Sequence, residues 1–187
     1  MKNKVRYSIV LPTYNHCEDL LKPCLESITK YTDKETEVIV VANGCTDNTL
    51  EYLHSLTDIN LRVIWVDEPL GYTKATNLGI KQAQGEYIVL LNNDTVLLPQ
   101  PVNYWLELLN APFVDPKTGI TGPVKFDWDC GGRQYQCMAF WLVMIRREVF
   151  EKISESSSGK TFSEESCQKM SEAKRGLKRG PYKKAGK

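Results

Sequence analysis

The sequence has no long hydrophobic run, which excludes a bilayer-spanning helix within it. Its longest apolar stretch, Met138 to Ile145, is much shorter than the roughly 20 residues that such a helix needs. The first residues lead directly into a strand-like segment and show no secretory signal pattern. We therefore expect a cytoplasmic location, with at most peripheral contact with a membrane.

Metal-ligand spacing and a strong net charge are also missing. The six cysteines form no CxxC pair and no zinc-ligand pattern, so we expect free thiols in a reducing compartment. A net charge of +1 gives no reason to expect nucleic acid as a partner. The charge is uneven, because residues 154–187 carry nine Lys or Arg and four Glu, a net of +5, which leaves −4 for residues 1–153.

The chain does contain an alternation of short apolar segments with helical patterns. Strands are predicted at 7–11, 37–41, 61–66 and 87–91, and helices at 18–31, after Thr46 or Asp47, and at 72–83. This alternation indicates βαβ units and a parallel sheet. Right-handed crossovers then place the carboxyl ends of all these strands on one edge of the sheet.

The second half is less regular. We predict a helix at 102–109, strands at 120–126 and 138–145, and a helix at 146–153, with Phe140 and Trp141 in the core. Pro12 is expected to stop the first strand, and Pro23 to begin or bend the first helix. Residues 154–163 are predicted to be mobile and 177–187 to form a disordered basic tail. The prediction is therefore one α/β domain over residues 1–153, followed by a Ser/Lys-rich segment, 154–187, that is partly disordered.

Polar residues follow the strands at the expected carboxyl edge. The apolar strand 87–91 ends in Asn92-Asn93-Asp94, where a carboxylate flanked by amides suits a hard divalent cation that carries phosphates. Pro12-Thr13-Tyr14-Asn15 offers a hydroxyl, an aromatic face and an amide, a combination that suits a nucleobase. The third loop, 42–49, could contact a ribose or base. Turn formation and helix capping are the alternatives for all three loops.

Together these loops resemble a known family. The segments SIVLPTYN, VIVVANGCTDNT and GYTKATNLGIKQAQGEYIVLLNNDTVL are similar to those of family 2 glycosyltransferases, over roughly residues 7–153. The resemblance implies the GT-A fold, a Rossmann-like α/β fold with a mainly parallel sheet sandwiched by helices. It also implies metal-assisted, inverting transfer of a sugar from a nucleoside diphosphate donor to a hydroxyl.

The resemblance also assigns residues. It implies that Pro12, Thr13, Tyr14 and Asn15 hold the nucleotide with Asn43 and Asp47 nearby, that Lys74 and Asn77 lie near the phosphates or the sugar, and that Asn92, Asn93 and Asp94 occupy an Asp-X-Asp motif. Asp94 would then be the remaining carboxylate ligand of Mg²⁺ or Mn²⁺. Two positions depart from the family pattern: Ala42 stands where many members have Asp, and Asn92 replaces the first Asp of the motif.

A general base must take the proton from the acceptor hydroxyl in an inverting transfer. Family members usually supply it from a Glu-Asp motif, and Glu165, preceded by Glu164, falls at about that place. A solvated helix start is the alternative for these two residues. Asp127 and Asp129, on either side of Trp128, are further candidates on the acceptor side.

The expected partners are a UDP-, GDP- or dTDP-linked sugar and a glycan, lipid-linked or protein acceptor. A rival from another class is a nucleotide-sugar-binding module without turnover, which Ala42, Asn92 and the Glu164-Glu165 pair favour. A nucleotidyltransferase would ordinarily show a Gly-rich basic loop after the first strand, and Pro12-Thr13-Tyr14-Asn15 has none. A basic-tailed interaction protein would not need polar residues at three strand ends.

Overall fold

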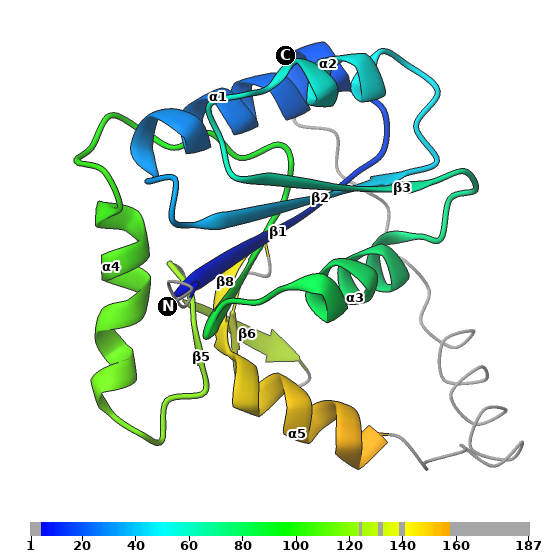
Figure 1. Ribbon diagram of the computed structural model, residues 1–187. Coiled ribbons are helices and arrows are strands. Elements are labelled where there is room, and N and C mark those ends of the chain that lie inside the picture. The colour runs from blue at the N-terminus through cyan, green and yellow to red at the C-terminus, as the bar shows by residue number, and fades with distance from the viewer. Residues whose placement is uncertain (1–4, 124, 131–132, 139–140, 158–187) are drawn as a thin grey trace, which may run out of the picture. The chain divides into compact units, whose positions relative to one another are not determined.

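The computed structural model describes residues 5–123, 125–130, 133–138 and 141–157 (Figure 1). Contacts within the chain divide it into two units, residues 1–150 and 151–187. Only residues 151–157 of the second unit are described, and they are the last residues of the helix Arg147–Ser157. The fold and the candidate site therefore belong to the first unit.

The chain alternates strands and helices in its first half, as predicted. The strands are β1 (Tyr7–Thr13), β2 (Glu37–Asn43), β3 (Leu61–Val66), β4 (Tyr87–Leu91), β5 (Ile120–Thr121), β6 (Lys125–Cys130), β7 (Arg133–Met138) and β8 (Leu142–Arg146). The helices are α1 (Lys22–Tyr31), α2 (Thr49–Ser55), α3 (Tyr72–Gln82), α4 (Tyr104–Asn110) and α5 (Arg147–Ser157). A π-helical turn, η1 (Cys17–Leu21), precedes α1, and a 3₁₀ turn, η2 (Ala111–Val114), follows α4.

Six strands form one mixed sheet in the order β3-β2-β1-β4-β8-β5, and β6 and β7 form a separate hairpin. The pairs β3–β2, β2–β1 and β1–β4 are parallel, whereas β8 is antiparallel to both β4 and β5. The predicted α/β fold with a mainly parallel sheet is therefore confirmed. Because β1 to β4 point the same way, their carboxyl ends share one edge of the sheet.

Alternating residues of the central strands point to opposite faces of the sheet, and both faces are buried. Ile9 and Val40 face one apolar cluster, which α1, α2 and α4 complete, whereas Val10 and Val41 face a second cluster under α3. In Figure 1, α1 and α2 accordingly lie on the opposite side of the sheet from α3. Gly79 lets α3 approach closely, since a Cβ at this position would lie 2.5 Å from the Val10 side chain. Burial on both faces explains why these strands appear continuously apolar in the sequence.

Several predicted boundaries were wrong. Pro12 does not stop β1, which continues to Thr13. The ladder between β1 and β4 ends at Val10, so one side of β1 has no partner strand at Pro12 and the missing N–H is tolerated. The strand predicted at 120–126 is instead the two-residue β5 followed by β6, and the strand predicted at 138–145 corresponds to the end of β7 and to β8.

The connection from β1 to α1 is unusual. Asn15 and His16 both have positive φ angles, 53° and 59°, and the π-helical turn follows directly. The α-helix then begins at Lys22 with Pro23 in its first turn, so of the two predicted roles Pro23 has that of a helix start. Left-handed residues and π turns are conformations that proteins often retain at functional sites.

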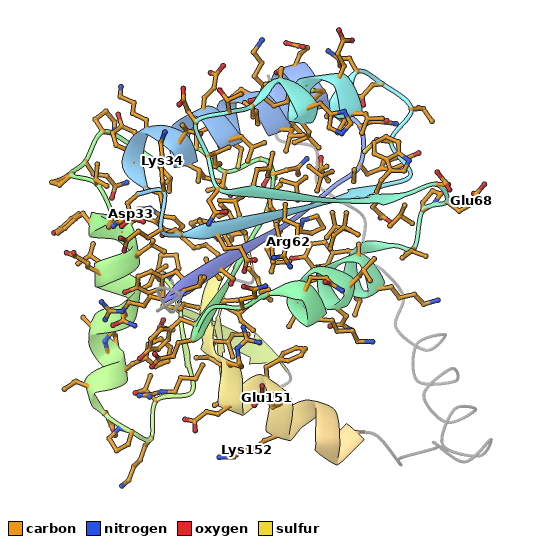
Figure 2. The ribbon with its side chains drawn as sticks, viewed as in Figure 1. Asp33, Lys34, Arg62, Glu68, Glu151 and Lys152 are labelled. Carbon is orange, nitrogen blue, oxygen red and sulfur yellow. The ribbon has the colours of Figure 1, made fainter. Side chains whose placement is uncertain are left out.

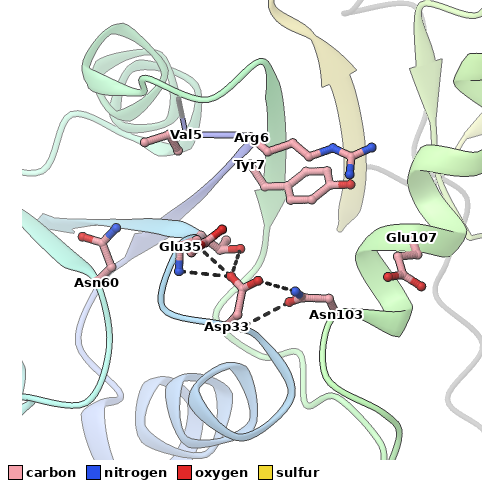
Figure 3. Close-up of a pocket in the computed structure, with 9 residues that line it drawn as sticks. Val5, Arg6, Tyr7, Asp33, Glu35, Asn60, Asn103 and Glu107 are labelled. Carbon is pink, nitrogen blue, oxygen red and sulfur yellow. Dashed lines mark hydrogen bonds between the residues drawn. The ribbon is translucent and has the colours of Figure 1, made fainter. Parts of the chain in front are cut away.

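A hydrogen-bonded clasp closes the amino edge of the sheet (Figure 3). The Asp33 carboxylate accepts hydrogen bonds from the Asn103 side chain and from the N–H and hydroxyl of Thr36, and the Asp33 N–H donates to Asn103 Oδ1. These residues line a cavity of about 340 Å³ together with Arg6 and Glu107. The cavity lies at the opposite edge from the predicted nucleotide loops.

A buried carboxylate organises the same edge. Glu37 is only 4% exposed and accepts hydrogen bonds from the Ser8 hydroxyl (2.7 Å) and the Gln84 N–H (2.9 Å). Its other oxygen lies 3.1 Å from Arg62 of β3, labelled in Figure 2. One side chain thus joins β1, β2, β3 and the turn before β4.

We expect Glu37→Ala to lower the free energy of unfolding by about 2–4 kcal/mol, because it leaves several buried donors without an acceptor. Urea unfolding would measure the change. Glu35→Ala is the matched control: this exposed side chain lies two residues away, and its loss should change stability by less than about 0.5 kcal/mol. An equal effect of both variants would contradict the central role of Glu37.

Candidate active site

The three predicted loops meet at the carboxyl edge of the sheet. In the sheet register, Thr13 of β1 pairs with Ala42 of β2, and Ala42 pairs with Trp65 of β3, so the strands end in line. Side-chain hydrogen bonds then join the loops that follow. The structure therefore brings together residues that are up to 80 positions apart in the sequence.

The loop after β1 is fastened to the loop after β2. The Thr46 N–H donates to Asn15 Oδ1 (2.7 Å), and the Asn15 N–H donates to Cys45 Sγ (3.3 Å). The Cys45 thiol also lies 3.7 Å from the Thr13 carbonyl oxygen. Two groups of the neighbouring loop, the Thr46 N–H and the Cys45 thiol, thus hold Asn15 in its left-handed conformation.

Asp47 makes a second connection between these loops. Its Oδ2 accepts a hydrogen bond from the Cys17 N–H at the start of η1 (3.0 Å), and its Oδ1 accepts one from the Thr49 N–H (3.2 Å). Burial alone would raise the pKa of Asp47, but the hydrogen bonds from Thr49 and Cys17 lower it below its ordinary value. Asp47 thus accepts the N–H and the hydroxyl of the first residue of α2, but the N-cap of this helix is Asn48 and not the predicted Thr46 or Asp47.

The loop after β2 also positions the loop before α3. Asn43 is 7% exposed, and its Oδ1 accepts the Leu70 N–H (2.7 Å), while the Gly44 N–H donates to the Val66 carbonyl (2.7 Å). Gly44 has a φ of +79°, and a Cβ there would lie 2.8 Å from Pro69. Only glycine fits this close passage of two loops.

The loop after β4 contacts the end of β1, the start of α3 and the residue before β8. Asn93 donates from Nδ2 to the Thr13 hydroxyl (3.0 Å). The Asn92 side chain accepts a hydrogen bond from the Tyr72 hydroxyl (3.1 Å), and its N–H donates to the Trp141 carbonyl (3.0 Å). Burial raises the pKa of the Cys24 thiol to about 12, so this group remains a neutral donor toward the Asn92 carbonyl.

Asp94 lies on this loop with its carboxylate exposed, and it forms no hydrogen bond or ion pair with another described residue. The described residues contain no group of three His, Cys, Asp or Glu side chains that would hold a metal by themselves. The donor set is one carboxylate and neighbouring amide oxygens. This set fits a hard cation whose remaining ligands are water and phosphate oxygens.

The other predicted donor residues differ in exposure. Tyr14 is 54% exposed at the end of β1, whereas Pro12 and Thr13 are buried. Lys74 and Asn77 are both exposed on α3 and lie three residues apart, which places them on one side of the helix. Tyr14, Lys74 and Asn77 therefore have side chains that a ligand can reach without rearrangement of the core.

Of the candidates for the base, only the backbones of Asp127 and Asp129 are described. Glu164 and Glu165 lie outside the described residues. Asp127 and Asp129 belong to β6, where their backbones pair with Gln136 and Gln134 of β7.

Two aromatic residues at this edge were not predicted. Trp141, which we expected in the core, is 38% exposed because it precedes β8 at the rim of the sheet. Tyr72 is 51% exposed at the first position of α3 and contacts Asn92 through its hydroxyl. The position of Trp141 beside the strand end could have suggested the rim, but its apolar neighbours masked that signal.

No helix in the described part of the chain has both the length and the apolar character that crossing a bilayer requires.

The sequence and the fold are both similar to those of known proteins. The sequence pattern described as Glycosyl transferase family 2 matches residues 8–138. The glycosyltransferase AglE of Haloferax volcanii is 32% identical over 133 residues, which is 67% of this chain and 41% of that protein. A chondroitin synthase of Pasteurella multocida is 36% identical over 112 residues, which is 59% of this chain and 11% of that protein. The chain thus spans less than half the length of these relatives.

Solved structures share the fold. The mannosyltransferase PcManGT of Pyrobaculum calidifontis, in complex with GDP-Man and Mn²⁺, superposes with a TM-score of 0.64 at 23% identity, over 81% of this chain and 47% of that chain. TarS of S. aureus (residues 1–349), in complex with UDP, superposes with a TM-score of 0.50 at 30% identity, over 59% of this chain and 32% of that chain. Both matches confirm the predicted GT-A architecture.

Replacing Asp47 should loosen the connection between the first two loops. We expect Asp47→Ala to lower stability by about 1 kcal/mol, because the N–H groups of Cys17 and Thr49 lose the acceptor that joins them. Asp47→Asn removes the charge and allows a test of pH dependence. Because the pKa of Asp47 is lowered in the folded protein, its contribution is present above about pH 4 and is lost as pH falls through the folded pKa.

Melting temperatures of the wild type and Asp47→Asn from pH 7 to pH 2 would measure this effect. The difference between the two proteins should be constant near neutral pH and should narrow below about pH 4. A difference that stays the same across the whole range would show that the charge of Asp47 does not stabilise the fold.

Proposed function

The chain belongs to glycosyl transferase family 2, and on this premise we propose that it transfers a sugar from a nucleoside diphosphate donor to a hydroxyl acceptor. The observation that carries the proposal is the joining of three polar loops at the carboxyl edge of the parallel strands, through the Asn15–Thr46 and Asn93–Thr13 hydrogen bonds. Ligands of open α/β sheets bind at this edge. The similarity to TarS, solved with UDP, supports a nucleoside diphosphate as the leaving group.

The strand order suggests how the donor lies. The loops after β1 and β2 would hold the nucleoside, with the exposed Tyr14 ring available to the base. The diphosphate would extend toward β4, where Asp94 is exposed, and Lys74 and Asn77 of α3 would contact the phosphates or the sugar. Neighbouring strands lie about 4.8 Å apart, so the distance from β2 across β1 to β4 is about 10 Å, which suits a nucleoside diphosphate.

A divalent cation, Mg²⁺ or Mn²⁺, would neutralise the diphosphate and make it a better leaving group. Asp94 would hold it, with the amide oxygen of Asn92 or Asn93 nearby. A single carboxylate with substrate phosphates is an ordinary arrangement for Mg²⁺. The hydrogen bonds of Asn92 to Tyr72 and Trp141 would keep this loop in position for that contact.

The proposed reaction inverts the anomeric carbon. The acceptor oxygen attacks that carbon from the side opposite the diphosphate, a general base takes the hydroxyl proton, and the diphosphate leaves with the bonding electrons. We propose Glu165 as the base, with Glu164 beside it. Asp127 and Asp129 of β6 are the next candidates.

A UDP-, GDP- or dTDP-linked sugar is the proposed donor, and a glycan, lipid-linked or protein hydroxyl is the proposed acceptor. We also propose a cytoplasmic location. A nucleotide-sugar-binding module without turnover is the second candidate. Two observations favour it: Asp94 is the single carboxylate of the motif, and Ala42, which is fully buried, offers no polar contact to a base.

Metal-dependent donor binding should depend on Asp94. We expect UDP-, GDP- or dTDP-sugars with Mn²⁺ to raise the melting temperature of the wild type, and Asp94→Ala to abolish the metal-dependent part without unfolding the chain. Thermal shift followed by calorimetry would measure both. Asp58→Ala is the control, because Asp58 is an equally exposed carboxylate in the loop before β3, at the opposite edge.

The donor screen also separates the two candidates. Stabilisation with slow donor hydrolysis supports a transferase, and stabilisation without hydrolysis or transfer to any acceptor supports the binding module. No stabilisation by any donor would contradict both. Unchanged donor affinity in Asp94→Ala would remove Asp94 from the metal site.

The proposed base gives a separate prediction. Glu165→Gln keeps the shape of the side chain but cannot accept the proton, so we expect turnover to fall by a factor of about 10²–10⁴ with donor affinity unchanged. Initial rates with saturating donor, together with calorimetry, would measure both. Full turnover would assign the role to another group, and Asp127→Asn and Asp129→Asn would then be compared.

A further inference from the structure

We propose that Trp141, together with Tyr72, forms an aromatic platform on which a sugar ring of the acceptor stacks, so that the acceptor is a carbohydrate. This inference rests on the proposed function and names the acceptor class. Both side chains are exposed at the same edge, Trp141 at 38% and Tyr72 at 51%. They come from segments far apart in the sequence, since Tyr72 begins α3 and Trp141 directly precedes β8.

A single residue positions both aromatic residues. Asn92 accepts a hydrogen bond from the Tyr72 hydroxyl through its side chain (3.1 Å), and it donates its N–H to the Trp141 carbonyl (3.0 Å). The hydrogen bond between Asn92 and Trp141 lies next to the last pair of the β4–β8 ladder, in which Leu91 pairs with Leu142. The platform is therefore fixed to the loop that carries Asp94.

The Trp141 indole is available to a ligand. Of the three tryptophans whose side chains are described, Trp65 donates its indole N–H to Asp67 and Trp105 donates its own to Thr32. Trp141 has no such partner among the described residues. An exposed indole offers an apolar face with negative charge density and a free N–H at its edge.

A pyranose ring matches this combination. One side of the ring presents C–H groups with partial positive charge, which suit the indole face, and its hydroxyls can accept from the indole N–H. A lipid chain would use the apolar face but leave the N–H unpaired. The Tyr72 hydroxyl and the Asn92 side chain, which bond to each other, also favour a ligand with hydroxyl groups.

The strand order places the Trp141 end of this platform on the acceptor side of Asp94. Along the carboxyl edge, the order β2-β1-β4-β8 puts Trp141 one strand beyond Asp94 and on the opposite side of it from the nucleotide loops. The nucleophile must approach the anomeric carbon from the side opposite the diphosphate. A diphosphate held at β4 therefore directs the acceptor to approach over the start of β8.

Trp141→Ala and Trp141→Phe test the platform by ligand-observed saturation-transfer NMR, which does not depend on the replaced indole. The probes are cellobiose, maltose, lactose and N,N′-diacetylchitobiose, each added to protein with UDP or GDP and Mn²⁺. We expect at least one disaccharide to bind the wild type. Trp141→Ala should lower the affinity for that disaccharide about tenfold or more, and Trp141→Phe should lower it less. Trp65→Phe is the matched control, because Trp65 is similarly exposed (36%) at the end of β3.

Calorimetry on the same variants separates this inference from the proposed function. We expect both Trp141 variants to bind nucleoside diphosphate and nucleotide sugar as the wild type does. Donor binding without any Trp141-dependent disaccharide signal would overturn the platform and leave the proposed function intact. Disaccharide binding without donor binding would overturn the proposed function instead.

Two further results would overturn the acceptor assignment. Trp141→Ala could weaken the binding of the nucleotide sugar but not the binding of the free nucleotide, in which case the sugar ring that stacks on Trp141 belongs to the donor. Octyl glucoside could give a Trp141-dependent signal when methyl glucoside and the disaccharides give none, in which case the platform binds an alkyl chain. A melting curve of each variant shows whether it is folded.

Discussion

The buried Glu37 carboxylate is the interaction on which the arrangement of the sheet depends. It receives hydrogen bonds from β1 and from the turn that leads into β4, and it pairs with Arg62 of β3. Ser8 and Glu37 are also partners in the β1–β2 register. The Glu37 contacts fix the positions at which these strands begin. Because β-strands rise by nearly the same distance per residue, the positions at which the strands end are fixed as well. The alignment of Thr13, Ala42 and Trp65 at the other edge follows from this contact.

The first half of the fold could be predicted because local and global preferences agree there. The apolar runs of β1, β2 and β4 are buried on both faces, and the helices between them have apolar residues at helical spacing. The second half could not be placed with the same accuracy. Ile120–Phe126 is apolar at both ends, but only Ile120 and Thr121 pair with β8, and the chain then enters a hairpin. Which strands pair is decided by tertiary contacts that have no local signature.

For the site, residue types and their order predicted which loops meet, and the hydrogen bonds from Thr46 to Asn15 and from Asn93 to Thr13 agree with that prediction. Sequence alone did not show how the loops are held. The thiol of Cys45 lies between Thr13 and Asn15, a role that no spacing indicates. The exposure of Trp141 was not predicted for a related reason. Hydrophobicity indicates only a general preference for burial, and Trp141 lies just before the start of β8, where the side chain is exposed despite that preference.

The predominance of amides over carboxylates among the residues that join the strand-end loops has an electrostatic consequence. Asn15, Asn43, Asn92 and Asn93 orient their neighbours through dipoles rather than charges. Such a rim repels an approaching dianion less than a row of carboxylates would, whether or not a cation arrives first. Encounter with a doubly charged ligand would therefore vary little with ionic strength, and selectivity at this edge would depend on shape and hydrogen-bond direction.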